Sequence, residues 1–288
     1  MDISVFTEKA KKLGVLSFKI TQNGILLNEW YSENEIRRNI YSATKSFTSC
    51  AVGFAVQEGL LSVDEKVVDA FCDDLPQTIS DNLKKATVED LLTMRLGQKD
   101  AHLMAAQRLH YKEDDWVKKA LAIPLDYEPK THFVYSNVGP YLAGILVQRR
   151  AKCTLVDYLM PRLFAPLGIK RPTWETDYQG NSFGSGGLFL SLSELHKFGL
   201  LYLNKGNWEG QQLLAPEWIE ATAKDHVTNP PYGYLFWRGE YNSFRADGMY
   251  SQLSIIFPDK SAVISVVANC YDGQSLLRAI YDDLCPQL

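Results

Sequence analysis

The sequence of 288 residues lacks the marks of several protein classes. Its longest apolar runs, such as residues 262–268, have the length of a β-strand and are far too short to cross a bilayer. Basic residues (30 Lys and Arg) do not exceed acidic ones (34 Asp and Glu), and no basic stripe is present, which argues against a nucleic-acid partner. Residues 1–4 have an acidic second position and no apolar leader follows them, so we expect a cytoplasmic protein with no membrane partner, or an exported one if the natural chain carries a leader before residue 1.

Cysteine and histidine are also scarce. The five cysteines form no Cys-x-x-Cys pair, which predicts reduced thiols rather than disulfides. The five histidines are scattered without the spacing of metal ligands, and we expect no metal and no other cofactor. The remaining composition, 46% hydrophobic and 22% charged, is that of a globular chain long enough for one large domain or two closely joined ones.

The most informative motif is Ser-x-x-Lys at residues 42–45, which begins a helix-like run that continues to residue 55. One helical turn separates Ser42 from Lys45, so the hydroxyl and the amine would lie on one face and share a proton. A serine hydroxyl becomes a good nucleophile when an adjacent base takes its proton, and a lysine can do so when desolvation or nearby positive charge lowers its pKa. Apolar residues at helical spacing after Lys45 would provide that burial. The tetrad alone also fits an ordinary helix start in which Ser42 is the N-cap.

A second motif, Tyr-Ser-Asn at residues 135–137, supports the first. Flanking proline and glycine place it in a loop that leads to an apolar helix over residues 141–147. The Tyr135 hydroxyl could serve as a base or proton relay, and the Asn137 amide could hold a substrate carbonyl. The same spacing recurs at Tyr202, but there it ends an amphipathic helix and is interpreted as structural.

The order of predicted elements indicates an α/β (α+β) fold. Strand patterns near both ends, with helical patterns between them, imply one antiparallel sheet built from both termini, flanked by helices, with an inserted and mostly helical lobe. We divide the chain into a sheet-containing α/β domain of residues 1–41 and 170–288 and a helical lobe of residues 42–169, with a cleft at their boundary. The predicted strands are 15–20, 25–30, 234–237, 252–257 and 262–268, and a last helix is predicted over 275–284.

Together, the two motifs, with their order and contexts, resemble the serine β-lactamase and DD-peptidase superfamily. The resemblance is strongest to the class C β-lactamase-like branch, which includes family VIII carboxylesterases and 6-aminohexanoate oligomer hydrolases. It implies a β-lactamase-like fold in which Ser42 forms an acyl-enzyme while Lys45 and Tyr135 shuttle protons. Asn137 would orient the substrate. Further segments that carry the resemblance are residues 58–64, 88–94, 166–169, 184–188, 197–199 and 216–218.

The third motif of the superfamily is usually Lys or His, a variable residue and Gly, on a strand beside the site. It is best matched here by Ala-Asp-Gly, beginning at Ala246, which occupies the cationic position. We expect Arg245 to face away from the site, because adjacent strand side chains point to opposite faces. Gly248 would let substrate lie against the backbone, and Met249 N–H would join Ser42 N–H in an oxyanion hole. A weak match of this kind also fits an edge-strand bulge.

These features predict a serine hydrolase acting on a small-molecule ester, amide or β-lactam. Because Ala246 lacks the cation that helps to hold a substrate carboxylate in the superfamily, we expect an esterase or small-amide hydrolase rather than a β-lactamase. The alternative is a catalytically silent, penicillin-binding-like sensor or binding protein that is acylated without turnover, and the missing cation is its best support. The sequence gives no indication of the oligomeric state.

Overall fold

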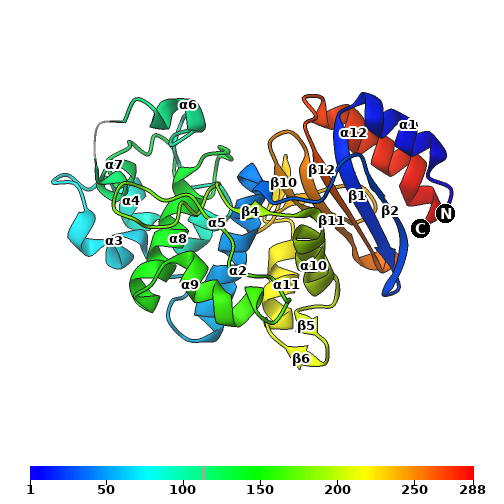
Figure 1. Cartoon of the computed structure of the whole chain (residues 1–288). Helices are drawn as coiled ribbons and strands as arrows, with labels where there is room; N and C mark the ends of the chain where they lie inside the picture. The colour runs from blue at the N-terminus through cyan, green and yellow to red at the C-terminus, as the bar shows by residue number, and fades with distance from the viewer. Residues whose placement is uncertain (112–113) are drawn as a thin grey trace.

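Both ends of the chain contribute to one antiparallel sheet in the computed structural model, which describes residues 1–111 and 114–288. The sheet has eight strands in the order β2-β1-β12-β11-β10-β9-β8-β7, so the amino-terminal hairpin pairs directly with the last strand (Figure 1). This arrangement confirms the predicted sheet and its origin from both termini. The strands are β1 Val15–Gln22, β2 Ile25–Tyr31, β7 Val227–Thr228, β8 Pro231–Tyr232, β9 Trp237–Arg238, β10 Phe244–Gly248, β11 Gln252–Phe257 and β12 Ala262–Ala268.

The amino-terminal hairpin forms where the Asn-Gly pattern predicted it. Asn23 and Gly24 have φ angles of 52° and 76°, which suit the two central positions of a tight hairpin turn. Two smaller ribbons lie outside the main sheet, and the first of them leads directly into the Ser-x-x-Lys segment. They pair β3 (Arg38–Asn39) with β4 (Phe189–Leu190) and β5 (Asn207–Trp208) with β6 (Gln211–Gln212).

Helices from the two ends of the chain cover one face of the sheet (Figure 1). The predicted carboxy-terminal helix is present as α12 (Gly273–Ala279), which continues as a π-helical turn over Ile280–Leu284. Beside it lies α1 (Ser4–Lys12), which the sequence analysis did not predict. Phe6 of α1 packs edge-on against Phe18 of β1, with ring centroids 5.0 Å apart, so this face has a core of its own.

The opposite face of the sheet packs against α10 (Leu192–Leu203). Beyond it lies α2 (Thr44–Gln57), which is buried over its first twelve residues and packs against α8 (Val138–Ala151). Stacked rings of Phe47 and Phe198, with centroids 3.8 Å apart, join α2 to α10. One large apolar cluster therefore runs from the sheet into the helical part of the chain and holds the start of α2 in place.

Helices α2 to α9 gather on one side of the sheet, and α1 and α12 lie on the other (Figure 1). The domain boundaries near residues 41 and 170 stay a prediction. None of the helices in the described part of the chain has the length and apolar character needed to cross a bilayer. The remaining helices are α3 Val67–Ala70, α4 Asp81–Lys85, α5 Val88–Leu92, α6 Ala105–Arg108, α7 Trp116–Leu121, α9 Leu155–Leu159 and α11 Pro216–Ala223. Shorter turns of 3-10 or π-helix cover Tyr41–Ala43, Cys72–Asp74, Met160–Phe164, Pro258–Lys260 and Cys285–Gln287.

One predicted strand, over residues 234–237, is wrong. Leu235 has a left-handed φ of 60°, and its N–H donates to Leu92 O at the end of α5 rather than to a neighbouring strand. Only Trp237 and Arg238 pair in the sheet, as β9. The positive φ interrupts the extended backbone. The contact with α5 is distant in sequence, so the local pattern of aromatic and apolar residues could not indicate it.

Candidate active site

Ser42 lies in the short turn of residues 41–43, between β3 and α2. Tyr41 has a left-handed φ of 47°, which is uncommon for a bulky residue, and its N–H donates to Asn39 Oδ1 at 2.7 Å. Lys45, one turn further on, places Nζ 3.0 Å from Ser42 Oγ. The structure thus brings the predicted nucleophile and the predicted base within hydrogen-bond distance.

Lys45 is almost completely buried, with 1% of its surface exposed. Its Nζ donates to Ser185 O at 2.7 Å, in the loop of residues 184–188. Burial and, to a smaller extent, the positive charge of Arg108 lower the pKa of Lys45 to about 7. A large fraction of the amine is therefore neutral near pH 7, and a neutral amine can take the proton of Ser42.

Tyr135 completes this group of side chains. Lys45 Nζ lies 5.1 Å from the centroid of the Tyr135 ring, and the Trp237 ring stacks against Tyr135 with centroids 5.3 Å apart. Burial raises the pKa of Tyr135 well above its usual range, although a hydrogen bond with Ser42 acts in the opposite direction. Tyr135 is thus protonated at neutral pH, which suits a proton relay better than a phenolate base.

Asn137 precedes α8, and its amide is engaged within the protein. Nδ2 donates to Leu103 O at 2.9 Å, while Oδ1 is buried without a hydrogen-bond partner among residues 1–111 and 114–288. Its backbone carbonyl accepts a hydrogen bond from Ser185 Oγ at 2.6 Å. These contacts fix the loop before Met104, a residue of the cleft wall. A substrate carbonyl needs a donor, whereas Oδ1 can only accept and Nδ2 already donates to Leu103 O, so the role of Asn137 in orienting substrate stays a prediction.

Strand β10 lies directly against the turn that carries Ser42. A Cβ on Gly248 would lie 2.1 Å from Ile40 O and 3.1 Å from Ala43 N, so only glycine allows this approach. This reason differs from the predicted one, in which the missing side chain makes room for substrate. Met249 N–H follows, and it has no acceptor within the described residues, as an oxyanion donor requires. Its pairing with Ser42 N–H in an oxyanion hole stays a prediction.

The predicted orientation of the third motif is wrong. Arg245 and Asp247 line the cleft, whereas Ala246 is completely buried in the apolar core. Side chains alternate along β10 as expected, but the even-numbered positions face the start of α2, as Gly248 shows, and the odd-numbered ones face the cleft. The charged side chains on the described wall of the cleft are therefore Arg245 and Asp247, which form an ion pair with Arg245 Nε 2.8 Å from Asp247 Oδ2.

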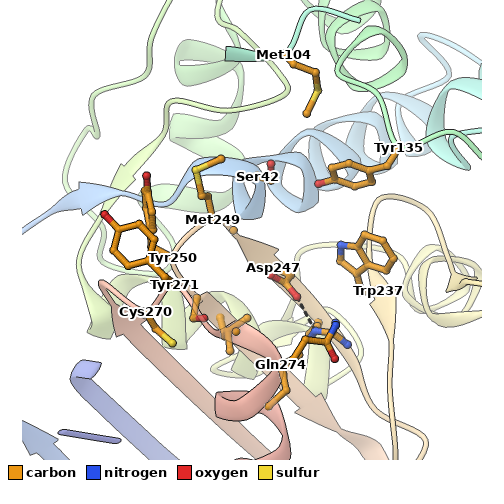
Figure 2. A pocket seen from close by; sticks show the side chains of 16 residues that line it. Ser42, Met104, Tyr135, Trp237, Asp247, Met249, Tyr250, Cys270, Tyr271 and Gln274 are labelled. Atoms are coloured by element: carbon orange, nitrogen blue, oxygen red, sulfur yellow. Dashed lines mark hydrogen bonds and ion pairs between the residues drawn. The ribbon is translucent and has the colours of Figure 1, made fainter. Parts of the chain in front are cut away.

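The cleft beside Ser42 has a volume of about 480 Å³ and is lined mainly by aromatic and other apolar side chains. Figure 2 shows Tyr135 and Trp237 on one side of Ser42 and Met249 on the other. Sequence reasoning missed most of this lining because no motif marks it and its residues are far apart in the chain. The missed residues include Met104, Trp237, Tyr250, Cys270, Tyr271 and Leu277.

Cysteines and groups of possible metal ligands were the subject of two further expectations from the sequence. All five cysteines are free in the structure, and their reduced state stays a prediction. One of them, Cys270, is buried in the cleft wall. Among the described residues, no group of three or more His, Cys, Asp or Glu side chains is placed to hold a metal ion.

A serine in contact with a buried lysine, beside a tyrosine and against a glycine of a sheet strand, defines the site of the Ser-Lys type of serine hydrolase. The chain belongs to the Beta-lactamase family, whose family model matches residues 32–284. This match confirms the superfamily inferred from the two sequence motifs, together with its fold.

Relatives of this chain include hydrolases of ester and amide bonds. Lovastatin esterase from Penicillium rubens is 31% identical over 150 residues, which are 44% of this chain and 37% of the esterase. The 6-aminohexanoate-dimer hydrolase of Paenarthrobacter ureafaciens is 21% identical over 244 residues, which are 78% of this chain and 62% of that enzyme. The chain thus spans less than two thirds of the length of either of these curated relatives.

Solved structures show the same fold. EstCE1, described as a hydrolase with promiscuous acyltransferase activity, superimposes with a TM-score of 0.78 at 15% identity, covering 97% of each chain. The penicillin binding protein from Bacillus halodurans superimposes with a TM-score of 0.75 at 17% identity, covering 97% of this chain and 99% of the other. At these identities the likeness extends to the fold and leaves the substrate open.

The lowered pKa of Lys45 gives an expectation for the pH dependence of catalysis. Because only neutral Lys45 can accept the proton of Ser42, kcat/KM should rise with pH through about 7 and level off above it. Arg108→Gln removes one of the two causes that lower this pKa, so the acidic limb should move to higher pH, whereas Arg108→Lys should leave it nearly in place. Arg108 also stacks on Phe183, so thermal unfolding of both variants is the control. An acidic limb of the kcat/KM profile that does not shift, or that shifts to lower pH, in Arg108→Gln would contradict this account.

Proposed function

We propose that the chain is a serine hydrolase that cleaves an ester or a small amide through an acyl-enzyme on Ser42. The observation that carries the proposal is the 3.0 Å contact between Ser42 Oγ and the Nζ of a buried lysine whose pKa is lowered to about 7. A serine needs an adjacent neutral base to attack a carbonyl at neutral pH, and Lys45 meets both conditions.

The first half of the reaction forms the acyl-enzyme. Ser42 Oγ attacks the carbonyl carbon as Lys45 Nζ takes its proton, and the carbonyl oxygen becomes an oxyanion facing the N–H groups of Ser42 and Met249. When the bond to the leaving group breaks, that group receives a proton, which passes from Lys45 by way of the Tyr135 hydroxyl. The product of this half is a Ser42 ester and the free alcohol or amine.

The second half repeats these steps with water. Lys45 and Tyr135 remove a proton from a water molecule as it attacks the Ser42 ester, and the same N–H groups stabilise the second oxyanion. Collapse of that intermediate returns the proton to Ser42 Oγ and releases the acid. No other protein group is needed to balance the protons.

The cleft favours neutral esters and amides over β-lactams. Arg245 is the one lysine or arginine among the described residues of the cleft wall, and it is already paired with Asp247. A substrate carboxylate would have to displace Asp247 from Arg245. It would therefore not gain the full charge-assisted hydrogen bond that an unpaired cation offers. The predicted preference for esters therefore stands on the Arg245–Asp247 pair and no longer on Ala246.

This preference is measurable with two chromogenic substrates. The catalytic efficiency on p-nitrophenyl butyrate should exceed that on a chromogenic cephalosporin by about tenfold or more, the effect of one missing charge-assisted hydrogen bond. Rates of the Ser42→Ala variant give the background for each substrate. A higher efficiency on the cephalosporin would show that Arg245 leaves Asp247 to bind the substrate carboxylate, and the proposed preference would be wrong.

A further inference from the structure

Asp247 is the residue of the cleft whose binding capacity the proposed mechanism leaves unused. It precedes Gly248, which lies against the turn of Ser42, so its Cα is about 3.8 Å from the Cα of the glycine that touches the nucleophile turn. Figure 2 shows its carboxylate between Met249 and Trp237 on the cleft wall. Ser42 and Asp247 thus line the same cleft.

The carboxylate is only partly satisfied by the protein. Oδ2 accepts a hydrogen bond from Arg245 Nε at 2.8 Å, and within the described residues Oδ1 accepts none. An ionised carboxylate has room for about four hydrogen bonds, so a ligand donor in the cleft would find free acceptor sites. Burial raises the pKa of Asp247, and the charge of Arg245 opposes that rise.

The two members of the ion pair differ in how much of them a ligand can reach. The Asp247 side chain is 26% exposed and that of Arg245 is 12% exposed. Arg245 is also held by a second hydrogen bond, in which its Nη1 donates to Arg238 O at 3.2 Å. Asp247 is therefore the more accessible member of the ion pair.

Aromatic side chains surround this negative group. Trp237 lies between Asp247 and Tyr135 on the same side of the cleft (Figure 2), and its ring stacks with that of Tyr135. The faces of aromatic rings attract cations, and this attraction adds to that of a carboxylate when the cation is partly desolvated. A carboxylate beside an indole ring is a suitable environment for an ammonium group.

We propose that Asp247 binds the ammonium group of the substrate, and that the chain acts on amino-bearing esters or amides whose amine lies a few bonds from the scissile carbonyl. The proposal rests on the proposed hydrolase function for the site, but it concerns Asp247 rather than Ser42 and the binding of an ammonium group rather than the cleavage of a bond. It goes beyond a preference for neutral substrates, because it adds an attraction for positively charged ones.

Binding of three small ligands to the purified protein tests the proposal without any need for turnover. Isothermal titration calorimetry should show that n-butylammonium binds about ten to a hundred times more tightly than n-butanol, the effect of one hydrogen bond to a charged group. Butyrate should bind more weakly than either. Equal binding of butylammonium and butanol, or tighter binding of butyrate, would overturn the proposal, the latter by showing that Arg245 controls the cleft.

The Asp247→Asn variant assigns the effect to this residue. Its preference for butylammonium over butanol should fall by about tenfold or more, whereas Asp69→Asn, which removes an exposed carboxylate from α3, should keep the wild-type preference. An unchanged preference in Asp247→Asn would contradict the assignment. The comparison of ligands on the wild type stands even if Asp247→Asn fails to fold.

Turnover separates the two proposals from each other. β-Alanine p-nitroanilide should be hydrolysed with a higher kcat/KM than propionyl p-nitroanilide, which differs from it by the ammonium group. Hydrolysis of neutral p-nitrophenyl esters without any preference for the amine would overturn the role of Asp247 and leave the hydrolase intact. If butylammonium binds but no substrate is hydrolysed, the hydrolase function would be overturned and the binding of ammonium by Asp247 would stand.

Discussion

Replacement of Ser42 with alanine is expected to lower kcat/KM on a p-nitrophenyl ester by about four orders of magnitude or more, the scale on which loss of a nucleophile acts in serine hydrolases. The substitution removes one oxygen atom from the turn of residues 41–43 and leaves the contact of Lys45 Nζ with Ser185 O in place. Folding should therefore be preserved while the covalent step is lost. Initial rates under first-order conditions, with the thermal midpoint measured on the same preparation, test this.

Ser49 offers a matched control on the same helix. Its hydroxyl is buried and has no hydrogen-bond partner within the described residues, so Ser49→Ala removes an oxygen that has no part in the proposed chemistry. The Ser49→Ala variant should keep ester hydrolysis within a small factor of the wild type. Near-normal hydrolysis in Ser42→Ala, or a comparable loss in both variants, would contradict the role of Ser42.

The second large effect concerns proton transfer. Lys45→Met and Tyr135→Phe should each lower turnover by about two to four orders of magnitude, as expected for a positioned acid or base. Methionine fills the space of the lysine without its amine, and phenylalanine keeps the ring that stacks on Trp237. Burial of Lys45 disfavours its charged form and so reduces the stability of the folded protein. Lys45→Met removes this penalty and should fold at least as well as the wild type at neutral pH.

Tyr202→Phe is the control for the tyrosine. Tyr202 has the same spacing to an asparagine as Tyr135, but it is buried within α10 and packs against Phe198 with ring centroids 4.7 Å apart. Its variant should hydrolyse esters at nearly the wild-type rate. Normal turnover in Tyr135→Phe or in Lys45→Met would place the proton shuttle on other groups.

Local sequence signals predicted the elements that depend on local chemistry. The Asn23-Gly24 turn, the helix after Ser42 and the strands β11 and β12 follow from turn residues and apolar periodicity, and all are present. Helix α1 was missed because it is held mainly by the apolar face that packs on the sheet, and a short amphipathic segment alone gives a weak signal.

The proximity of the candidate catalytic residues could be predicted because they lie in two compact motifs. Ser42 and Lys45 are one helical turn apart, and Tyr135 belongs to a loop that proline and glycine mark in the sequence. The direction of Arg245 and Asp247 could not be predicted in the same way. Alternation along a strand fixes which residues share a face, but only the contact of Gly248 with Ile40 O shows which face meets the cleft.

Rapid-quench mass spectrometry of the protein mixed with p-nitrophenyl butyrate tests the central claim most directly. A burst of p-nitrophenol should accompany the appearance of a butyryl group on the peptide that contains Ser42, and the adduct should disappear as the substrate is used up. An adduct that forms on Ser42 and persists without turnover would identify the acylated but silent protein that the sequence left as an alternative. Turnover with the butyryl group on another residue, or with none on Ser42 at any time, would contradict the account.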